Sequence, residues 1–133
     1  MRKGFPMYTF PKIEKLKSKK TIEALFAEGK NLREFPIKLI YLKTPFEDGG
    51  HIKVGVVAPK KKFKKAVDRN SIKRLLRESY RLNKSLIFNN IEGNYAFLFL
   101  YLGHKVPSFE EVDTTMKQLL EAFLKKECDE SVG

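Results

Sequence analysis

The segment from residue 60 to residue 84, KKKFKKAVDRNSIKRLLRESYRLNK, carries most of the positive charge of the chain. Its eleven Lys and Arg residues and two acids give 11 − 2 = +9, against a formal +11 for all 133 residues. From Asp68 onward the hydrophobic residues recur at helical spacing. At about 100° per residue, one helix face holds Arg69, Asn70, Lys73, Arg74, Arg77, Tyr80 and Arg81. The opposite face holds Ile72, Leu75, Leu76, Ser79, Leu82 and Leu86, so the segment predicts a helix docked on a core with its cations in solvent.

The start of this helix has its own signals. Asp68 is a suitable N-cap, and Val67 and Ile72 stand at the positions of a hydrophobic staple. A merely solvated surface helix would pair its cations with acids at i+4, which this segment does not do. Among the charges, Phe63, Asn70 and Tyr80 add stacking and hydrogen-bonding groups. A polyanionic partner is therefore favoured over a purely solvated face, and a membrane surface is disfavoured because the chain has no Trp.

The stretch RNSIKRLLRESYR, residues 69–81, resembles the signature motif of the protein subunit of bacterial ribonuclease P. The matching elements are Arg69-Asn70, Lys73-Arg74, Arg77 and Tyr80-Arg81. The preceding KVGVVAPKKKFKKAVD and the earlier TFPKIEKLKSKKTIEALFAEG resemble the strand, lysine-rich approach and opening helix of that family. The resemblance spans roughly residues 8–125. Two positions depart from the pattern, namely Ile22, where an aromatic is common, and Pro59, where serine is usual.

Length and composition predict one domain over residues 1–133, with a basic N-terminal arm (1–12) and an acidic C-terminal tail (126–133). The sequence pI of about 9.7 is typical of nucleic-acid-binding proteins. No apolar run is long enough to span a bilayer, and no secretory signal is recognisable. The single Cys128 is consistent with a reducing compartment, so we expect a cytoplasmic protein without a membrane partner.

Periodicity predicts the order helix, strand, strand, helix, strand, helix. A helix capped by Ser18 should end near Gly29 in a left-handed conformation, and strands 35–43 and 51–58 should pair as a hairpin. Within the second of these strands, Gly55 would permit a close approach of the backbone. The run YAFLFLYL, residues 95–102, predicts a strand buried on both faces, with an aromatic row that packs in the core or, alternatively, stacks on bases. Ser108 and Glu111 form a capping box for the last helix, whose apolar stripe includes Val112, Met116 and Phe123.

These elements predict an α+β fold, with a three- to four-stranded sheet packed against about three helices. Strand 51–58, the basic helix and strand 95–102 should form one crossover unit. General rules favour a right-handed crossover, whereas the family resemblance implies an unusual left-handed one, as in ribosomal-protein-like domains.

Catalytic residues are not evident. His51 and His104 lie far apart in the sequence, Cys128 has acidic neighbours, and zinc-ligand spacing and Gly-rich phosphate loops are absent from the sequence. A two-metal phosphodiesterase site needs converging carboxylates, whereas the acids here are scattered. We therefore expect no catalytic or metal-binding residue in the chain.

The resemblance implies an endoribonuclease in which the RNA subunit, with Mg2+ bound mainly by RNA, removes the 5′ leader of precursor tRNA. The chain would be the protein subunit, monomeric in a 1:1 complex with that RNA, and would also bind the leader. The family's RNA-contacting positions correspond to Lys60, Lys61, Lys62, Lys64, Lys65, Arg69, Asn70, Lys73, Arg74, Arg77, Tyr80 and Arg81. A cleft between the sheet and the first helix would hold the leader against Phe26, Ile22 and Tyr41.

Two other classes remain open at this point. A stand-alone RNA-binding or ribosomal-type protein could carry the same basic helix. A helix-turn-helix DNA-binding protein is less consistent with the pattern, because a strand separates the basic helix from each neighbouring helix.

Overall fold

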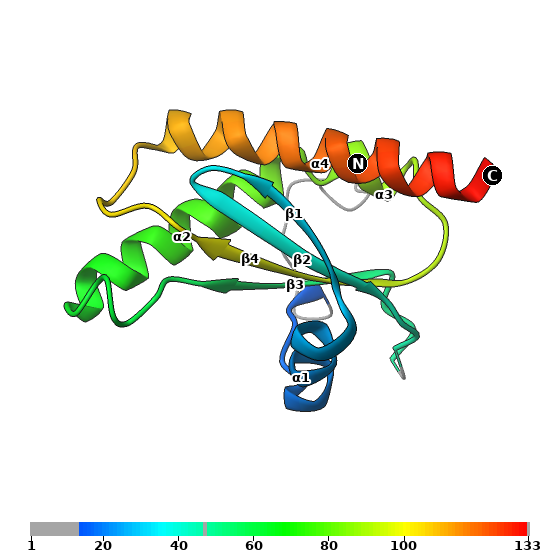
Figure 1. The fold of residues 1–133 in the computed structure, drawn as a ribbon, viewed down its shortest axis with the longest axis horizontal. Coiled ribbons are helices and arrows are strands. Elements are labelled where there is room, and N and C mark those ends of the chain that lie inside the picture. Colours follow the sequence, from blue (N-terminus) through cyan, green and yellow to red (C-terminus); the bar gives the residue numbers. More distant parts are fainter. Residues whose placement is uncertain (1–13, 47, 133) are drawn as a thin grey trace, which may run out of the picture.

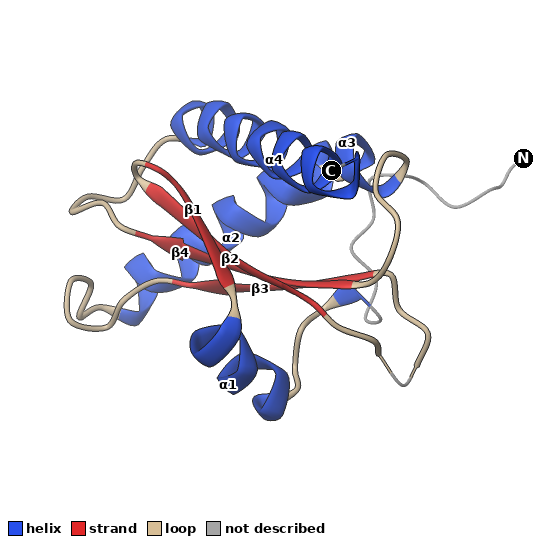
Figure 2. Ribbon diagram, turned by 45° about the vertical axis from the view of Figure 1, so that its right-hand side comes forward, coloured by secondary structure: helices blue, strands red, loops and turns tan. Residues whose placement is uncertain are grey.

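The computed structural model describes residues 14–46 and 48–132, in which one sheet separates two layers of helices (Figure 1). Helices α2 (Ala66–Asn83) and α4 (Phe109–Val132) cover one face, together with the short helix α3 (Ser85–Phe88). Helix α1 (Lys19–Glu28) covers part of the other face, as Figure 2 also shows. Over the described ranges, no helix combines the length and the hydrophobicity needed to cross a membrane.

The sheet has the strand order β1-β2-β4-β3. Its strands are β1 (Lys30–Glu34), β2 (Ile37–Lys43), β3 (Ile52–Val57) and β4 (Tyr95–Tyr101). The α+β class is thus confirmed, but the expected hairpin between strands 35–43 and 51–58 is wrong. Strand β2 pairs antiparallel with β1 and β4, while β3 pairs parallel with β4. Strand β1 escaped prediction because KNLRE is short, polar and almost wholly exposed, so it shows no apolar alternation.

Strand β4 is the central element, since it lies between β2 and β3 and is covered on both faces. Its aromatic row, Tyr95, Phe97, Phe99 and Tyr101, faces α2 and α4 and is at most 3% exposed. The core-packing interpretation of this row is therefore correct, and base stacking on it is excluded. Its other row packs toward α1, with Ala96 and Leu98 buried and Leu100 half-buried.

Helix α4 begins at the predicted capping box. The Glu111 amide donates to Ser108 Oγ (3.2 Å), and the Ser108 amide donates to Glu111 Oε1 (3.4 Å). Farther along, the Phe123 ring meets the rings of Tyr41 and Phe97 edge-on, with centroids 4.9 Å apart in both pairs. The helix continues to Val132, so the expected acidic tail from residue 126 forms its last turns.

Helix α1 begins as predicted, with the Thr21 amide donating to Ser18 Oγ at 3.2 Å. Its predicted left-handed end is wrong, because Gly29 has φ −67°. Glycine is needed here for space instead, since a Cβ would collide with the Leu25 carbonyl and lie 2.7 Å from Ile40 Cγ2. The predicted close approach at Gly55 is confirmed, because a Cβ there would lie 3.1 Å from Leu98 Cδ1.

The outer edge of β3 is covered by the chain that leads into α1. Lys15 forms a parallel bridge with Val54, and the Leu16 amide donates to the Val54 carbonyl at 2.9 Å. This pairing blocks part of an edge at which another strand could add. The predicted basic arm, residues 1–12, lies outside the described residues.

Helices α2 and α4 are joined by a polar cluster at Asp113. Its Oδ1 accepts hydrogen bonds from Asn83 Nδ2 (2.7 Å) and Ser79 Oγ (3.1 Å), and Lys117 Nζ lies 3.0 Å from Oδ2. Burial raises the pKa of Asp113, but the hydrogen bonds from Asn83, Lys117 and Ser79 outweigh it and lower the pKa below its ordinary 3.8. The charged carboxylate therefore stabilises the docking of α4 on α2.

We predict that Asp113→Asn lowers the free energy of unfolding at neutral pH. Because the folded-state pKa is depressed, the carboxylate's contribution is fully present above the unfolded pKa and is lost as pH falls through the folded value. The difference between wild type and variant should therefore shrink below about pH 4. Urea denaturation over a pH series measures this difference, with Glu121→Gln, at an exposed position farther along the same helix, as the control. A difference that stays constant down to low pH would contradict this role.

Candidate nucleic-acid interface

Helix α2 starts earlier than the sequence suggested. It begins at Ala66, so Asp68 is not the N-cap but lies in the first turn. Negative charge is favourable there because the first amides of a helix point outward with partial positive charge. The predicted staple is also wrong, since Val67 is 73% exposed and cannot pack on Ile72, which is fully buried.

The apolar side of α2 packs against β4 and α4. Ile72, Leu76 and Ser79 are buried as expected, whereas Leu82 is 38% exposed. The assignment of Tyr80 to the RNA contacts must be corrected, because its side chain is fully buried. Its ring centroid lies 5.9 Å from that of Phe99. Tyr80 lies at the border of the polar arc, and the core takes it because a large ring gains more from burial than from exposure.

The charged side of α2 presents a cationic helix face, formed by Asn70, Lys73, Arg74 and Arg77. Lys73 is half-buried and the other three are exposed. Arg81 forms a hydrogen-bonded ion pair with Glu78. The hydrogen bond raises the pKa of Arg81 and lowers that of Glu78. Lys84 is buried and lies 2.9 Å from Glu14 Oε1. Sequence periodicity gave no sign of this buried ion pair, since Glu14 is seventy residues away.

The lysine loop, residues 60–65, joins β3 to α2. Its five lysines, Lys60, Lys61, Lys62, Lys64 and Lys65, are exposed, while Phe63 is buried and anchors the loop beside Tyr101. Lys62 Nζ donates to the Leu102 carbonyl at 2.8 Å. Arg69 Nη1 donates to the carbonyls of Phe63 (2.7 Å) and Lys64 (2.9 Å). Arg69 therefore shapes the loop.

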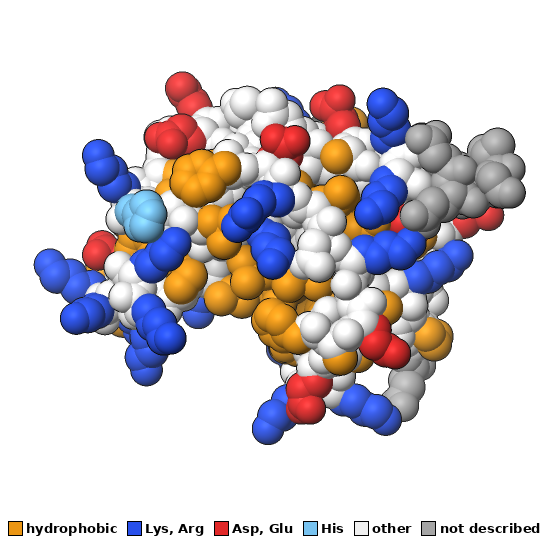
Figure 3. Space-filling view, viewed as in Figure 1, with side chains coloured by type: hydrophobic (Ala, Val, Ile, Leu, Met, Phe, Trp, Pro, Cys, Tyr) orange, Lys and Arg blue, Asp and Glu red, His pale blue; other side chains and the backbone are white. Residues whose placement is uncertain are grey.

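Beside the lysine loop, one end of the sheet lacks helix cover. On the α1 side, Ile40 and Leu98 are buried, but Lys38, Val57 and Leu100 near the loop are only half-buried. We call these three residues the open sheet face. Figure 3 shows apolar side chains gathered in a hollow at this height, between α1 at the bottom and the lysine-rich lobe on the left.

The structure separates the three residues expected in a leader cleft. Phe26 is 61% exposed on α1, and Ile22 is half-buried against the leucine-lined side of the sheet. Tyr41 lies on the opposite side of the sheet, under α4, where it is 1% exposed and its hydroxyl donates to Glu127 Oε2 at 3.0 Å. The assignment of Tyr41 to the cleft is therefore wrong. The error arose because both rows of β2 are apolar, so the alternation of side chains along the strand does not reveal which row faces α1.

In the part of the chain that the structure describes, no group of three or more His, Cys, Asp or Glu residues is placed to hold a metal ion. His51 packs edge-on against Phe88, with ring centroids 5.4 Å apart, and His104 is exposed in the loop after β4.

A cationic helix face, a lysine loop and an adjacent open sheet face together define a nucleic-acid-binding type of α+β protein. Comparison with known proteins identifies the family. The family model described as Ribonuclease P matches residues 10–124. The ribonuclease P protein component of Porphyromonas gingivalis strain W83 is 32% identical over 118 residues, covering 86% of each chain. The corresponding protein of Chlorobaculum tepidum is 33% identical over 126 residues, covering 86% of this chain and 82% of the relative.

Solved structures agree with these matches. The ribonuclease P protein of Thermotoga maritima superposes with a TM-score of 0.61 at 27% identity, covering 85% of this chain and 96% of that one. A Staphylococcus aureus ribonuclease P protein gives a TM-score of 0.66 at 18% identity, covering 82% and 94%, which supports the fold alone. The chain belongs to the ribonuclease P protein component family. The individual RNA contacts of the cationic helix face and the lysine loop stay predictions.

We predict that Arg69→Ala speeds tryptic cleavage within the lysine loop, because the loop loses the two hydrogen bonds to Phe63 and Lys64. Cleavage sites and rates are read by mass spectrometry under native conditions. Arg74→Ala is the matched control, since it removes an exposed arginine of the same helix that does not hold the loop. Equal cleavage rates in the two variants would show that Arg69 does not restrain the loop.

Proposed function

We propose that this protein binds the catalytic RNA subunit of ribonuclease P and the 5′ leader of precursor tRNA. It thereby assists the Mg2+-dependent endonucleolytic removal of the leader in the cytoplasm. The observation that carries this proposal is the placement of the cationic helix face and the lysine loop next to the open sheet face. Family membership supports the same role, because ribonuclease P proteins are named as components of a larger enzyme.

The cationic residues would act electrostatically. Arg74 and Arg77 project from α2 into solvent, and an arginine can bind two phosphate oxygens at once. Neutralising phosphates lowers the repulsion between an RNA enzyme and an RNA substrate, so less Mg2+ is required. RNA affinity should fall with salt at a log–log slope of roughly −0.7 to −0.9 per phosphate neutralised.

The open sheet face would hold a single strand. Its half-buried Val57 and Leu100 offer apolar contact to bases, Lys38 offers a cation, and Phe26 on α1 offers an exposed aromatic ring. Single-stranded RNA is commonly bound by such a combination of stacking surface and positive charge. In this proposal the RNA holds the Mg2+ ions and performs the cleavage, and the protein contributes binding and positioning.

The first test is cleavage of precursor tRNA at low, near-physiological Mg2+ by a bacterial ribonuclease P RNA, by this protein, and by the two together. We predict activity only in the mixture. With Arg77→Ala, RNA affinity should fall severalfold and the salt slope should become shallower by about one unit. Lys125→Ala removes an exposed cation from α4 and serves as the control.

Three outcomes would change the proposal. Cleavage by the protein alone would place a catalytic site in the chain. A silent mixture with the cognate RNA, while the protein still binds other structured RNAs, would favour a stand-alone RNA-binding protein. Equal effects of Arg77→Ala and Lys125→Ala would remove α2 from the interface.

We also predict that Phe26→Ala weakens binding of precursor tRNA but not of mature tRNA to the holoenzyme, because only the precursor has a leader to lie against α1. Loss of one base–aromatic contact corresponds to about 1–3 kcal/mol. Phe26 is largely exposed, so thermal unfolding should be unchanged. Equal losses for both tRNAs would show that Phe26 does not touch the leader.

A further inference from the structure

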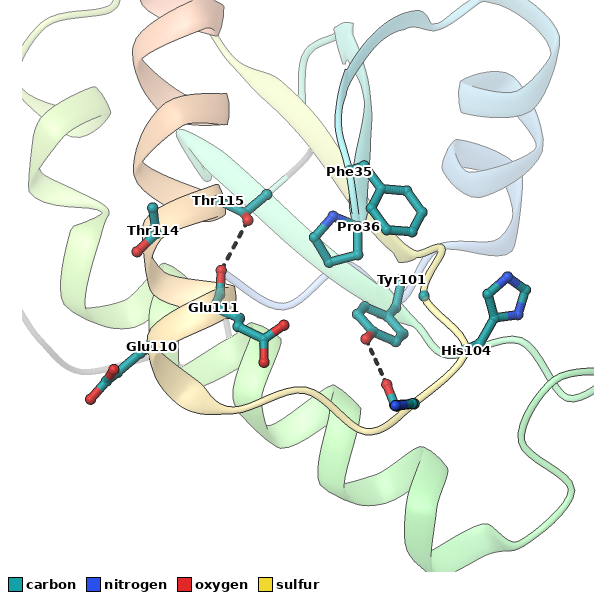
Figure 4. Close-up of a pocket in the computed structure, with 10 residues that line it drawn as sticks. Phe35, Pro36, Tyr101, His104, Glu110, Glu111, Thr114 and Thr115 are labelled. Atoms are coloured by element: carbon teal, nitrogen blue, oxygen red, sulfur yellow. Dashed lines mark hydrogen bonds between the residues drawn. The ribbon is translucent and has the colours of Figure 1, made fainter.

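A shallow cavity of about 700 Å³, wide open to solvent, lies between the turn that joins β1 to β2 and the start of α4. One wall is apolar and is formed by Phe35, Pro36 and Tyr101. The other includes Glu111 and Thr114 from the first turns of α4, and Lys105 lies in the loop that joins β4 to α4 (Figure 4). The volume is within the usual range of small-ligand sites.

The cavity is held in shape by several contacts. The Tyr101 hydroxyl donates to the Lys105 carbonyl at 2.6 Å, and Gly103 lies so close to that hydroxyl that a Cβ would collide with it. Thr115 Oγ1 donates to the Glu111 carbonyl at 2.9 Å, as Figure 4 shows. The Ser108 amide and hydroxyl both contact Glu111 Oε1. Tyr101 on one wall and Glu111 on the other are therefore positioned before any ligand arrives.

We propose that this cavity binds one unpaired RNA base that carries an exocyclic amino group, as adenine, cytosine and guanine do. Phe35 is 69% exposed, which gives a base an aromatic ring to stack on. The Glu111 carboxylate points toward this apolar wall from α4 (Figure 4), and a carboxylate accepts hydrogen bonds but donates none. Uracil offers the carboxylate only its N3–H, which is flanked by two carbonyl oxygens that the carboxylate repels, so we expect it to bind less tightly than a base with an exocyclic amino group.

The position of the cavity fits a strand bound elsewhere on the protein. Pro36 lies two residues before Lys38 of the open sheet face, and Leu102 follows Leu100 of the same face. Lys62 reaches the Leu102 carbonyl, so the lysine loop adjoins the loop that borders the cavity. The open sheet face lies on the α1 side and the cavity on the α4 side of the same end of the sheet. A strand would therefore turn around this end, past the lysines that bind its phosphates, to place a base in the cavity. This inference rests on the proposed function, because it needs RNA on the open sheet face.

The test uses fluorescein-labelled single-stranded oligoadenylate, oligocytidylate and oligouridylate of equal length, titrated with the full chain at fixed salt. Wild type should bind the adenylate and cytidylate about tenfold more tightly than the uridylate. Phe35→Ala and Glu111→Gln should each bring this ratio within about twofold of one. Glutamine keeps the capping box and the shape of Glu111 but adds a donor for carbonyls. Val106→Ala, at an exposed position of the same loop outside the cavity lining, should leave the ratio unchanged.

The outcomes separate this inference from the proposed function. Binding of all three oligonucleotides with equal affinity, or a preference that survives in both variants, would overturn the base-binding cavity and leave the proposed function intact. Failure of wild type to bind any of them, together with precursor tRNA cleavage that is insensitive to Phe26→Ala, would overturn strand binding on the sheet and the cavity with it.

Discussion

Burial of β4 on both faces is the constraint on which the rest of the structure depends. Its aromatic row needs a cover, which α2 and α4 supply, and Phe123 fits edge-on between Tyr41, Tyr95 and Phe97 with ring centroids 4.9–5.1 Å away. Its second row needs α1, which packs there through Leu25. Because both faces of β4 are covered in this way, the basic segment that joins β3 to β4 can run along the outside as α2 and keep its cations in water.

The cations of the basic segment have two different roles. Arg74 and Arg77 are exposed, and so are the five lysines of the lysine loop. By contrast, Arg69 holds that loop, Lys84 pairs with Glu14 in the interior, and Arg81 pairs with Glu78. The net charge of a segment therefore overstates the positive charge that is available to a partner, because some of its cations bind groups within the protein and shape the surface that carries the others.

Much of the fold could be predicted from the sequence where one rule acted alone. The N-cap at Ser18, the capping box at Ser108, the buried run of β4 and the stripe of α4 each follow from a local pattern. Prediction failed where two patterns competed. Strand β2 has apolar residues in both of its rows, so its pattern does not show on which face of the sheet Tyr41 lies. Its neighbour β1 gave no help, because that strand is polar and has no periodic signal. Tyr80 lies between a charged arc and an apolar arc, and only the position of Phe99 decides between them. The cavity at Phe35 is beyond sequence reasoning because it joins a turn to a helix more than seventy residues away.

The tight contact at Gly29 bears on the width of the hollow between α1 and the lysine loop. A single residue links α1 to β1, and its backbone lies directly on Ile40 with no room for a side chain. This contact holds α1 close against the sheet. On the far side of the hollow, hydrogen bonds from Arg69 and Lys62 hold the lysine loop. These contacts set the width of the hollow. Within the proposed function, that width would discriminate between single-stranded and double-stranded nucleic acids before any chemical group is compared.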